Sequence, residues 1–112
     1  MNLDYAVDRL YDAGWLPTAD TAVERLADGR WFPTVATIVR EFVAAGLQLS
    51  IKHNIMFNCY RATWAPNNER LDVDHAADER HGTVVGSCER EAAVYALAQL
   101  RSSAGIRQIA MA

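Results

Sequence analysis

The strongest constraint on this chain is a stretch of alternating residues in its second half. Leu47 to Ala65 reads LQLSIKHNIMFNCYRATWA, and GTVVGSCEREAAVYALAQL follows from Gly82. Apolar and polar residues alternate in the first stretch, as in strands with one wet face, whereas the end of the second has helical spacing. The pattern predicts a βββα unit behind a preceding helix. It indicates a fold and demands no particular chemistry.

Size and charge restrict the chain to one small domain. Its 112 residues, 51% of them hydrophobic, can bury one core. The formal charge of -3 and the pI near 5.5 lack the basic excess of phosphate-binding surfaces, so nucleic acid is an unlikely partner. Two cysteines are too few for a disulfide scaffold, and no signal peptide or bilayer-spanning apolar run is evident. We expect a cytoplasmic protein of bacterial type without a membrane partner.

Three helices are predicted from apolar residues at helical spacing and from residues that favour helix ends. Leu3, Val7 and Leu10 share one face of the first helix, which Gly14 can end. The apolar stripe of the second also stops at a glycine. The third begins after Ser87, with two glutamates in its first turn, and SSAG at 102–105 is expected to end it. The predicted ranges are about 3–13, 34–45 and 88–101.

These helices and strands define an α+β fold class. A three-stranded antiparallel sheet is packed by helices in a single compact domain. A helical segment at 1–46 precedes the βββα unit at 47–101, and residues 106–112 are expected to form a frayed tail. The predicted strands cover about 47–52, 55–64 and 82–86 within a domain that spans 1–105.

A short repeat occurs sixteen positions apart. AVDRLYDAGWLPT begins at Ala6 and AVERLADGRWFPT at Ala22, with eight identical residues. One interpretation is a reused unit of helix and turn, in which a tryptophan follows each glycine-containing end and a proline stops the helix; the other is coincidence. On the first interpretation, residues 21–29 form a short helix with Thr21 and Glu24 in a capping box.

The turn between the first two strands decides which residues share a face of the sheet. A three-residue turn that ends at Asn54 pairs Ile51 with Ile55. A two-residue turn would place Leu49 against Asn58, which is a poorer match. The longer turn is therefore predicted, and it gives an inner face of Leu47, Leu49, Ile51, Ile55, Phe57 and Cys59.

The opposite face of the second predicted strand is too apolar for simple exposure. Met56, Tyr60, Ala62 and Trp64 lie on it, which suggests a second covering layer or a partner surface. Arg61 lies between Tyr60 and Trp64 in the sequence, and an arginine between aromatic rings suits planar or acidic groups. A competing interpretation packs the two aromatic residues under a helix and turns the arginine to water. The predicted binding residues are Met56, Tyr60, Arg61 and Trp64, for a protein partner or for self-association as a homodimer.

An acidic loop, PNNERLDVDHAADERH, is predicted from Pro66 to His81 and expected to be long and mobile. It gathers hard-metal ligands, but their spacing fits neither a calcium loop nor a helical histidine pair, and a solvated loop explains them without a metal. No metal or cofactor is predicted. The alternative is a small-ligand or metal site at 72–81 and the start of the last helix, with Asp72, Asp74, His75, Asp78 and His81 as its residues.

Cysteine chemistry is the remaining catalytic possibility. A helix N-terminus lowers the pKa of a thiol, and His81 could act as the base for Cys88, but Glu89 and Glu91 oppose the thiolate. Cys59 adds no paired ligand spacing of the kind that a structural zinc site needs. No catalytic residue is predicted. The expected function is a small non-catalytic interaction or accessory domain.

The predicted element order resembles known families. An α-β-β-β-α order that ends in a glycine, a serine and an alanine-rich helix resembles the double-stranded RNA-binding domain, whose last helix presents lysines to phosphates. The matching positions here, Ser87 to Glu91, contain two carboxylates that would repel phosphate. The chain also resembles a small phage-type αβα-sandwich domain and other uncharacterised bacterial proteins, and the resemblance lies in Pro33 to Gly46, Phe57 to Trp64 and Gly86 to Leu100. These resemblances imply a fold and no activity.

Overall fold

The computed structural model describes the backbone of residues 3–19, 21–68 and 80–111, and side chains as far as Ser102. Within these residues it contains three helices and two antiparallel sheets, which confirms the α+β class. The elements are α1 Leu3–Asp12, β1 Val23–Arg25, β2 Trp31–Pro33, α2 Val35–Ala44, β3 Leu47–Asn54, β4 Cys59–Pro66, β5 Gly82–Gly86 and α3 Glu89–Met111.

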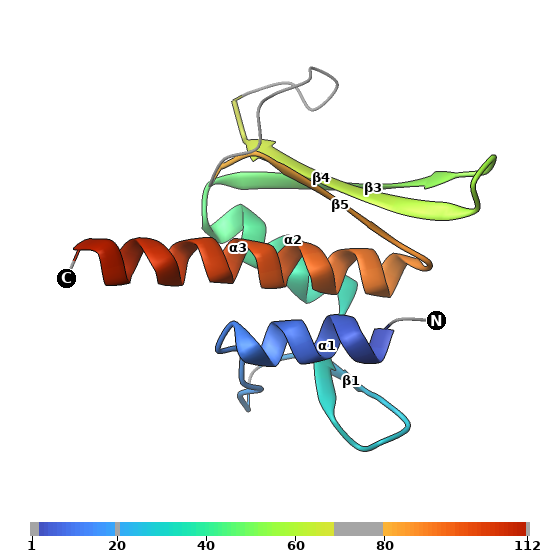
Figure 1. Ribbon diagram of the computed structural model, residues 1–112, viewed down its shortest axis with the longest axis horizontal. Coiled ribbons are helices and arrows are strands. Elements are labelled where there is room, and N and C mark those ends of the chain that lie inside the picture. The colour runs from blue at the N-terminus through green and yellow to red at the C-terminus, as the bar shows by residue number, and fades with distance from the viewer. Residues whose placement is uncertain (1–2, 20, 69–79, 112) are drawn as a thin grey trace.

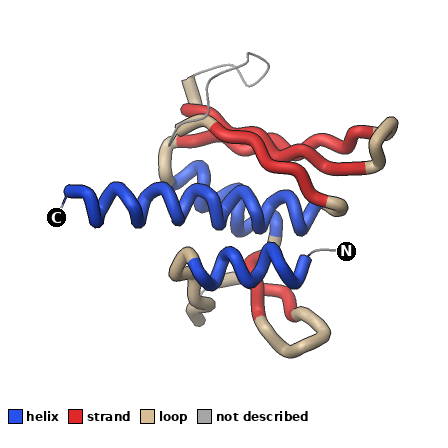
Figure 2. Tube along the Cα trace, in the orientation of Figure 1, coloured by secondary structure: helices blue, strands red, loops and turns tan. Residues whose placement is uncertain are grey.

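The elements stack in three layers. Strands β3, β4 and β5 form one sheet in that order, and α2 and α3 pack on one of its faces. Helix α1 and the small β1–β2 sheet lie on the far side of α3 (Figures 1 and 2). One contiguous apolar cluster runs through these layers. The helical segment and the βββα unit predicted from the sequence therefore share a core.

Helix α3 is the middle layer, and its composition explains why. Ala92, Ala93 and Ala96 are fully buried, as are Val94 and Leu97. A helix that is apolar all round is buried on all sides, and small side chains let its neighbours approach closely. Helix α3 can therefore contact the sheet on one side and α1 on the other, as its contacts with α1, β4 and β5 show.

The register of the sheet differs from the predicted one. Asn54 pairs with Cys59, so the turn covers residues 55–58, and Leu49 pairs with Trp64. The predicted turn that ends at Asn54 is therefore wrong. Leu47, Leu49 and Ile51 of the predicted inner face do point toward the helices. Ile55 and Phe57 of that predicted face are instead exposed residues of the turn.

The observed register is favoured because it places the largest side chain of the sheet in the core. Trp64 is 2% exposed, and its ring meets that of Phe42 edge-on, with 5.6 Å between the centroids. Burying a tryptophan gains more than burying an isoleucine or a phenylalanine at a strand end. Ala62 is also buried against the helices, so the predicted outward face of Ala62 and Trp64 is wrong.

Glycines at both ends of β5 make room for this packing. A Cβ atom on Gly82 would lie 2.1 Å from Cζ2 of Trp64, and one on Gly86 would lie 2.6 Å from the backbone nitrogen of Ala92. Both distances are far inside van der Waals contact. Gly82 therefore accommodates the indole ring, and Gly86 lets the start of α3 lie against the sheet.

The two copies of the repeat fold differently. The first forms α1, which ends at Asp12, two residues before Gly14 (φ 93°), whereas the second forms the β1–β2 hairpin rather than the predicted short helix at 21–29. In the second copy the glycine follows Asp28 directly, and Asp-Gly favours a turn. The Asp28 carboxylate accepts a hydrogen bond from the backbone N–H of Arg30 at 2.9 Å, and this bond lowers the pKa of Asp28. The repeat is not a repeated structural unit.

Ion pairs on the surface connect the hairpin to the helices. Arg30 pairs with Asp8 of α1, and Arg90 of α3 pairs with Glu24 at 2.9 Å. The Tyr11 hydroxyl donates to the carbonyl of Trp31 at 2.7 Å. Each exposed ion pair contributes little by itself. The hairpin is held mainly by Phe32 and Leu26, which belong to the shared core.

Helix ends were predicted well except at the C-terminus. Thr34 caps α2 by accepting a hydrogen bond from the N–H of Thr37 at 3.2 Å, in agreement with the predicted helix at 34–45. Helix α3, however, continues through Met111 instead of ending near residue 101. A glycine weakens a helix by only about 1 kcal/mol, and no proline follows to stop it. The helix in the described chain thus extends into the predicted tail.

The predicted loop at 66–81 lies mostly outside the described residues. Among the helices that the structure does describe, none has both the length and the hydropathy of a bilayer span.

The register can be tested by the stability of two variants. Trp64→Ala should lower the free energy of unfolding by about 3–5 kcal/mol because it empties a core site. The control Trp31→Ala, at a residue that is 40% exposed, should cost less than about 1 kcal/mol. Denaturant titration followed by circular dichroism measures both. Equal losses would place Trp64 outside the core and overturn the register.

The structure has the β1–β2 hairpin where the sequence predicted a short helix, and substitutions of Gly29 can test this difference. Its φ of 94° is unfavourable for residues with a Cβ atom, so Gly29→Ala should lower the free energy of unfolding by about 1–2 kcal/mol. Gly29→Asn should cost less, because asparagine tolerates positive φ. In a helix the order would reverse, since alanine is the better helix former. Thermal unfolding of both variants distinguishes the two structures.

Candidate functional site

The four predicted binding residues do not form one surface. Met56 is in the β3–β4 turn, and Arg61 is exposed on the sheet face that the helices leave uncovered. Tyr60 is half-buried on the opposite face, and Trp64 is in the core. The structure therefore brings Met56 and Arg61 together and separates them from the two aromatic residues. For those two, the competing interpretation of packing under a helix is the observed one.

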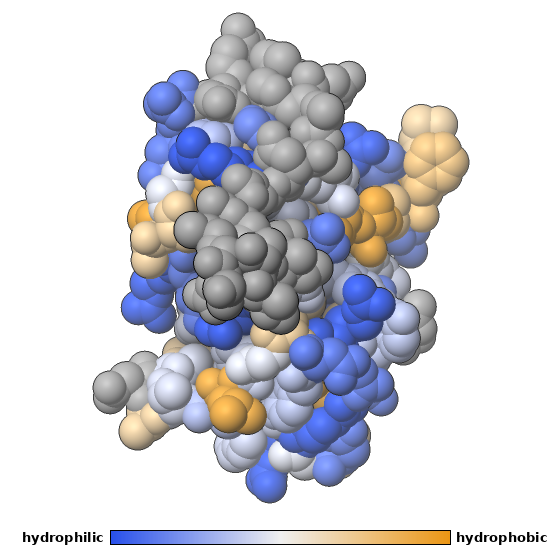
Figure 3. All heavy atoms as spheres, turned by 60° about the vertical axis from the view of Figure 1, so that its left-hand side comes forward, coloured by the Kyte–Doolittle hydropathy of each residue, from blue (hydrophilic) through white to orange (hydrophobic). Residues whose placement is uncertain are grey.

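The exposed apolar residues of this region gather in the turn. Ile55, Met56 and Phe57 are consecutive, and their exposed fractions are 83%, 88% and 75%. The β3–β4 hairpin, called the hairpin from here on, extends beyond the start of α3, so its turn forms one end of the molecule (Figure 1). In the space-filling view, apolar side chains protrude from the outline at the height of this turn (Figure 3). We call Ile55, Met56 and Phe57 the hairpin tip.

Two asparagines hold the hairpin tip in its conformation. The side-chain oxygen of Asn54 accepts a hydrogen bond from the N–H of Phe57 at 3.2 Å. Asn58 has φ 47°, in the left-handed region that asparagine tolerates. Its side chain also lies 3.2 Å from Nε2 of His53, whose ring stacks on Tyr60 with 4.5 Å between the centroids. The exposed side chains are thus presented from an ordered turn.

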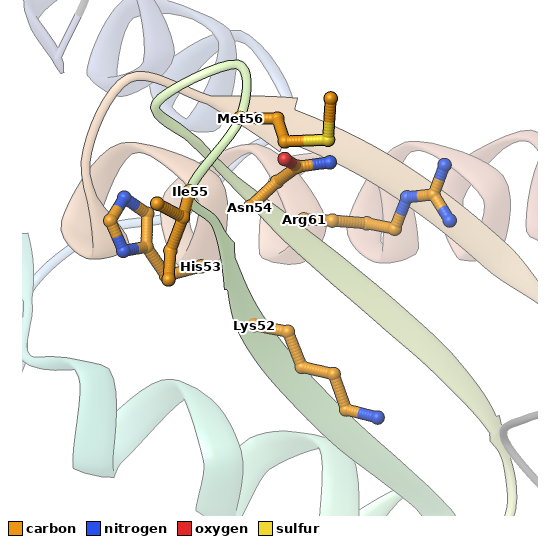
Figure 4. A pocket seen from close by; sticks show the side chains of 6 residues that line it. All are labelled: Lys52, His53, Asn54, Ile55, Met56 and Arg61. Carbon is orange, nitrogen blue, oxygen red and sulfur yellow. The ribbon is translucent and has the colours of Figure 1, made fainter.

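A hollow of about 440 Å³ lies beside the hairpin tip. Lys52 and Arg61 point to the same side of the hairpin, and His53 points to the other (Figure 4). Lys52 and Arg61 are paired residues on neighbouring strands. Side chains that are directly opposite have Cβ atoms about 5 Å apart, and like charges in this arrangement are destabilising. The hollow is lined by Lys52, His53, Asn54, Ile55, Met56 and Arg61.

The hairpin differs in charge from the rest of the protein. Residues 42–68 contain two of the eleven lysines and arginines, Lys52 and Arg61, and no carboxylate. The remaining nine cations stand against all fourteen carboxylates elsewhere in the chain. Among the described residues, no ion pair involves Lys52 or Arg61, whereas Arg30, Arg90 and Arg101 each pair with a carboxylate. The site is a positive region of an acidic protein.

The start of α3 belongs to the alternative site that the sequence suggested. Glu91 is buried, and its carboxylate accepts hydrogen bonds from the backbone N–H of Ser87, at 3.1 Å, and from the Ser87 hydroxyl. The start of α3 is therefore already occupied by the protein's own carboxylate, which disfavours phosphate there. Burial and the nearby Glu91 raise the pKa of Tyr95, one turn further along α3.

Metal and cysteine chemistry gain no support from the described residues. Cys59 and Cys88 are free thiols, both half-buried. Of the predicted loop ligands only His81 is described, and no group of three possible ligands forms in the part of the chain that the structure covers. Predicted ligands Asp72, Asp74, His75 and Asp78 lie outside the described residues.

No protein-family model matches the chain, and no curated protein or solved structure matches it. The family resemblances suggested by the sequence thus stay predictions.

The sequence signal for the hairpin tip is a pair of asparagines, of which the predicted turn included only Asn54. Asn54 and Asn58 are four residues apart, and asparagine favours both the start of a turn and positive φ. These residues enclose the turn that the structure shows. The apolar character of the three residues between them pointed to a strand instead, because exposed apolar turns are uncommon.

The like-charge pair gives a testable prediction about stability. Lys52→Glu should raise the free energy of unfolding by a few tenths to about 1 kcal/mol, because it replaces a repulsion of Arg61 with an attraction. Lys52→Gln should give a smaller gain. Urea titration at low ionic strength measures both, and the gain should shrink at about 1 M salt, where screening is strong. A loss of stability in Lys52→Glu would show that the two cations do not repel each other.

Proposed function

We propose that this protein is a small non-catalytic interaction domain that docks through the hairpin tip and the adjoining cations Lys52 and Arg61. One observation carries the proposal. The hairpin tip exposes three large apolar side chains in a row, although the core is complete without them. Exposed apolar groups that add nothing to folding are typical of contact sites.

The order of the turn supports docking. A contact made by a preorganised loop loses less conformational entropy than one made by a flexible loop. The hydrogen bond from Phe57 to Asn54 and the stacking of His53 on Tyr60 restrict the turn before any partner arrives. The uncompensated cations support it as well, because a partner's negative groups would relieve their repulsion. We place this activity in the cytoplasm, as the sequence suggested.

The proposal predicts covalent capture of a partner from the hairpin tip. A photoreactive benzophenone amino acid at position 57 of the full chain, expressed in its native cells and irradiated, should give a discrete adduct. Gel electrophoresis and mass spectrometry would detect it. The matched control is the same group at position 16, because Leu16 is 71% exposed and Phe57 75%.

Position 57 should yield adducts several-fold above position 16. Equal yields at both positions, or none at position 57, would contradict the proposal that the hairpin tip is the docking site.

A further inference from the structure

The cations lie at a set depth behind the hairpin tip. Lys52 and Arg61 are two residues from the closing pair Asn54 and Cys59, which is about 7 Å along a strand. Apolar groups that bind at a membrane surface enter about 5–10 Å into the boundary between headgroups and acyl chains. With the hairpin tip at that depth, the two cations would lie at the level of the lipid phosphates.

The shape of the hairpin tip fits a fluid surface better than a protein groove. Its three side chains stand on a convex four-residue turn and offer a few hundred Å². A specific protein interface of standard size buries about 800 Å² per partner. A membrane needs no complementary surface, because lipid packs around whatever enters it. The sequence suggested a protein partner because it placed Met56, Tyr60 and Trp64 on one broad face, which does not exist.

A second copy of the chain is a poor occupant. A two-fold contact through the hairpin tips would bring Lys52 and Arg61 of one copy toward the same residues of the other. The repulsion already present within each hairpin would then be increased. A head-to-tail contact with an acidic surface would avoid this but would give rings or open-ended filaments rather than a two-fold dimer.

The charge distribution orients the protein toward a negative surface. All fourteen carboxylates lie outside the segment 42–68, so the rest of the chain is repelled by negative charge, whereas the hairpin is attracted. The cytoplasmic leaflet is negative, and its field decays within about 10 Å. The protruding hairpin can therefore reach this field ahead of the acidic body (Figure 1).

We infer that the hairpin tip inserts into anionic lipid surfaces, with Ile55, Met56 and Phe57 at the level of the acyl chains and Lys52 and Arg61 at the phosphates. The inference rests on the proposed function, of which it names the partner. Binding is weak and reversible, comparable with the roughly 10⁴ M⁻¹ of a single myristoyl chain.

Co-flotation with large unilamellar vesicles tests the inference. The full-length protein should float with vesicles of phosphatidylcholine containing 30 mol% (about one lipid in three) phosphatidylserine, a negative surface of the kind that attracts basic groups. It should stay with the soluble fraction when the vesicles are pure phosphatidylcholine. Raising the salt from about 0.1 M to about 0.5 M should weaken the binding by screening.

Two sets of variants separate the apolar contribution from the charged one. Ile55→Ser with Phe57→Ser should reduce the partition coefficient at least tenfold, and the control Leu16→Ser, at an equally exposed residue, should not. Lys52→Glu with Arg61→Glu should reduce it by roughly tenfold or more. Its control is Arg9→Glu with Arg40→Glu, which makes the same change in net charge at two exposed helical residues. Circular dichroism verifies that each variant is folded.

Each outcome decides the inference. Loss of binding in both variant sets, with binding retained in both controls, supports it. Equal binding to neutral vesicles, or binding that survives the loss of the hairpin tip, overturns it. No binding to either vesicle, combined with a protein adduct from position 57, overturns the lipid inference while the proposed interaction domain stands. No binding and no adduct from position 57 would remove both.

Discussion

The burial of Trp64 between Phe42 and the open backbone of Gly82 is the contact on which the rest of the sheet depends. It belongs to the observed register, in which Leu49 lies opposite Trp64 and both residues face the helices. That register moves the turn to 55–58 and leaves Ile55, Met56 and Phe57 without a place in the core. It also aligns Lys52 with Arg61 on the uncovered face. The candidate site is therefore a direct consequence of how the core is filled.

The sequence predicted the elements of the βββα unit better than their pairing. Strand β5 and helix α2 were found within a residue of their bounds because glycines mark the strand and because an apolar stripe that stops at a glycine marks the helix. The pairing of two strands depends on which of several apolar residues is buried most favourably. That choice depends on contacts with residues far away in the sequence. Gly82 shows the difficulty: its role is visible only when the indole ring is seen to occupy the space of its missing Cβ atom.

The candidate site was predicted in part. Met56 and Arg61 were predicted to bind a partner together, and both do line the same hollow. The reason for that prediction was wrong, because it placed them on one strand surface with Trp64, which is buried in the core. Lys52, opposite Arg61, was assigned to the turn, so the pair of cations could not be foreseen. A shift in register turns each residue of a strand to the other face, which is why one wrong turn altered the whole surface.

The different folding of the two repeat copies has a consequence for how such a protein can change. AVDRLYDAG forms a helix and AVERLADGR a hairpin, and the decisive difference is a glycine displaced by one position relative to the shared aspartate. Neither copy lies in the three-stranded sheet. Small insertions or deletions in this outer layer can thus convert one class of element into another, while Trp64 and its neighbours keep their arrangement. The layer beneath α3 is the part of the architecture most open to evolutionary rebuilding.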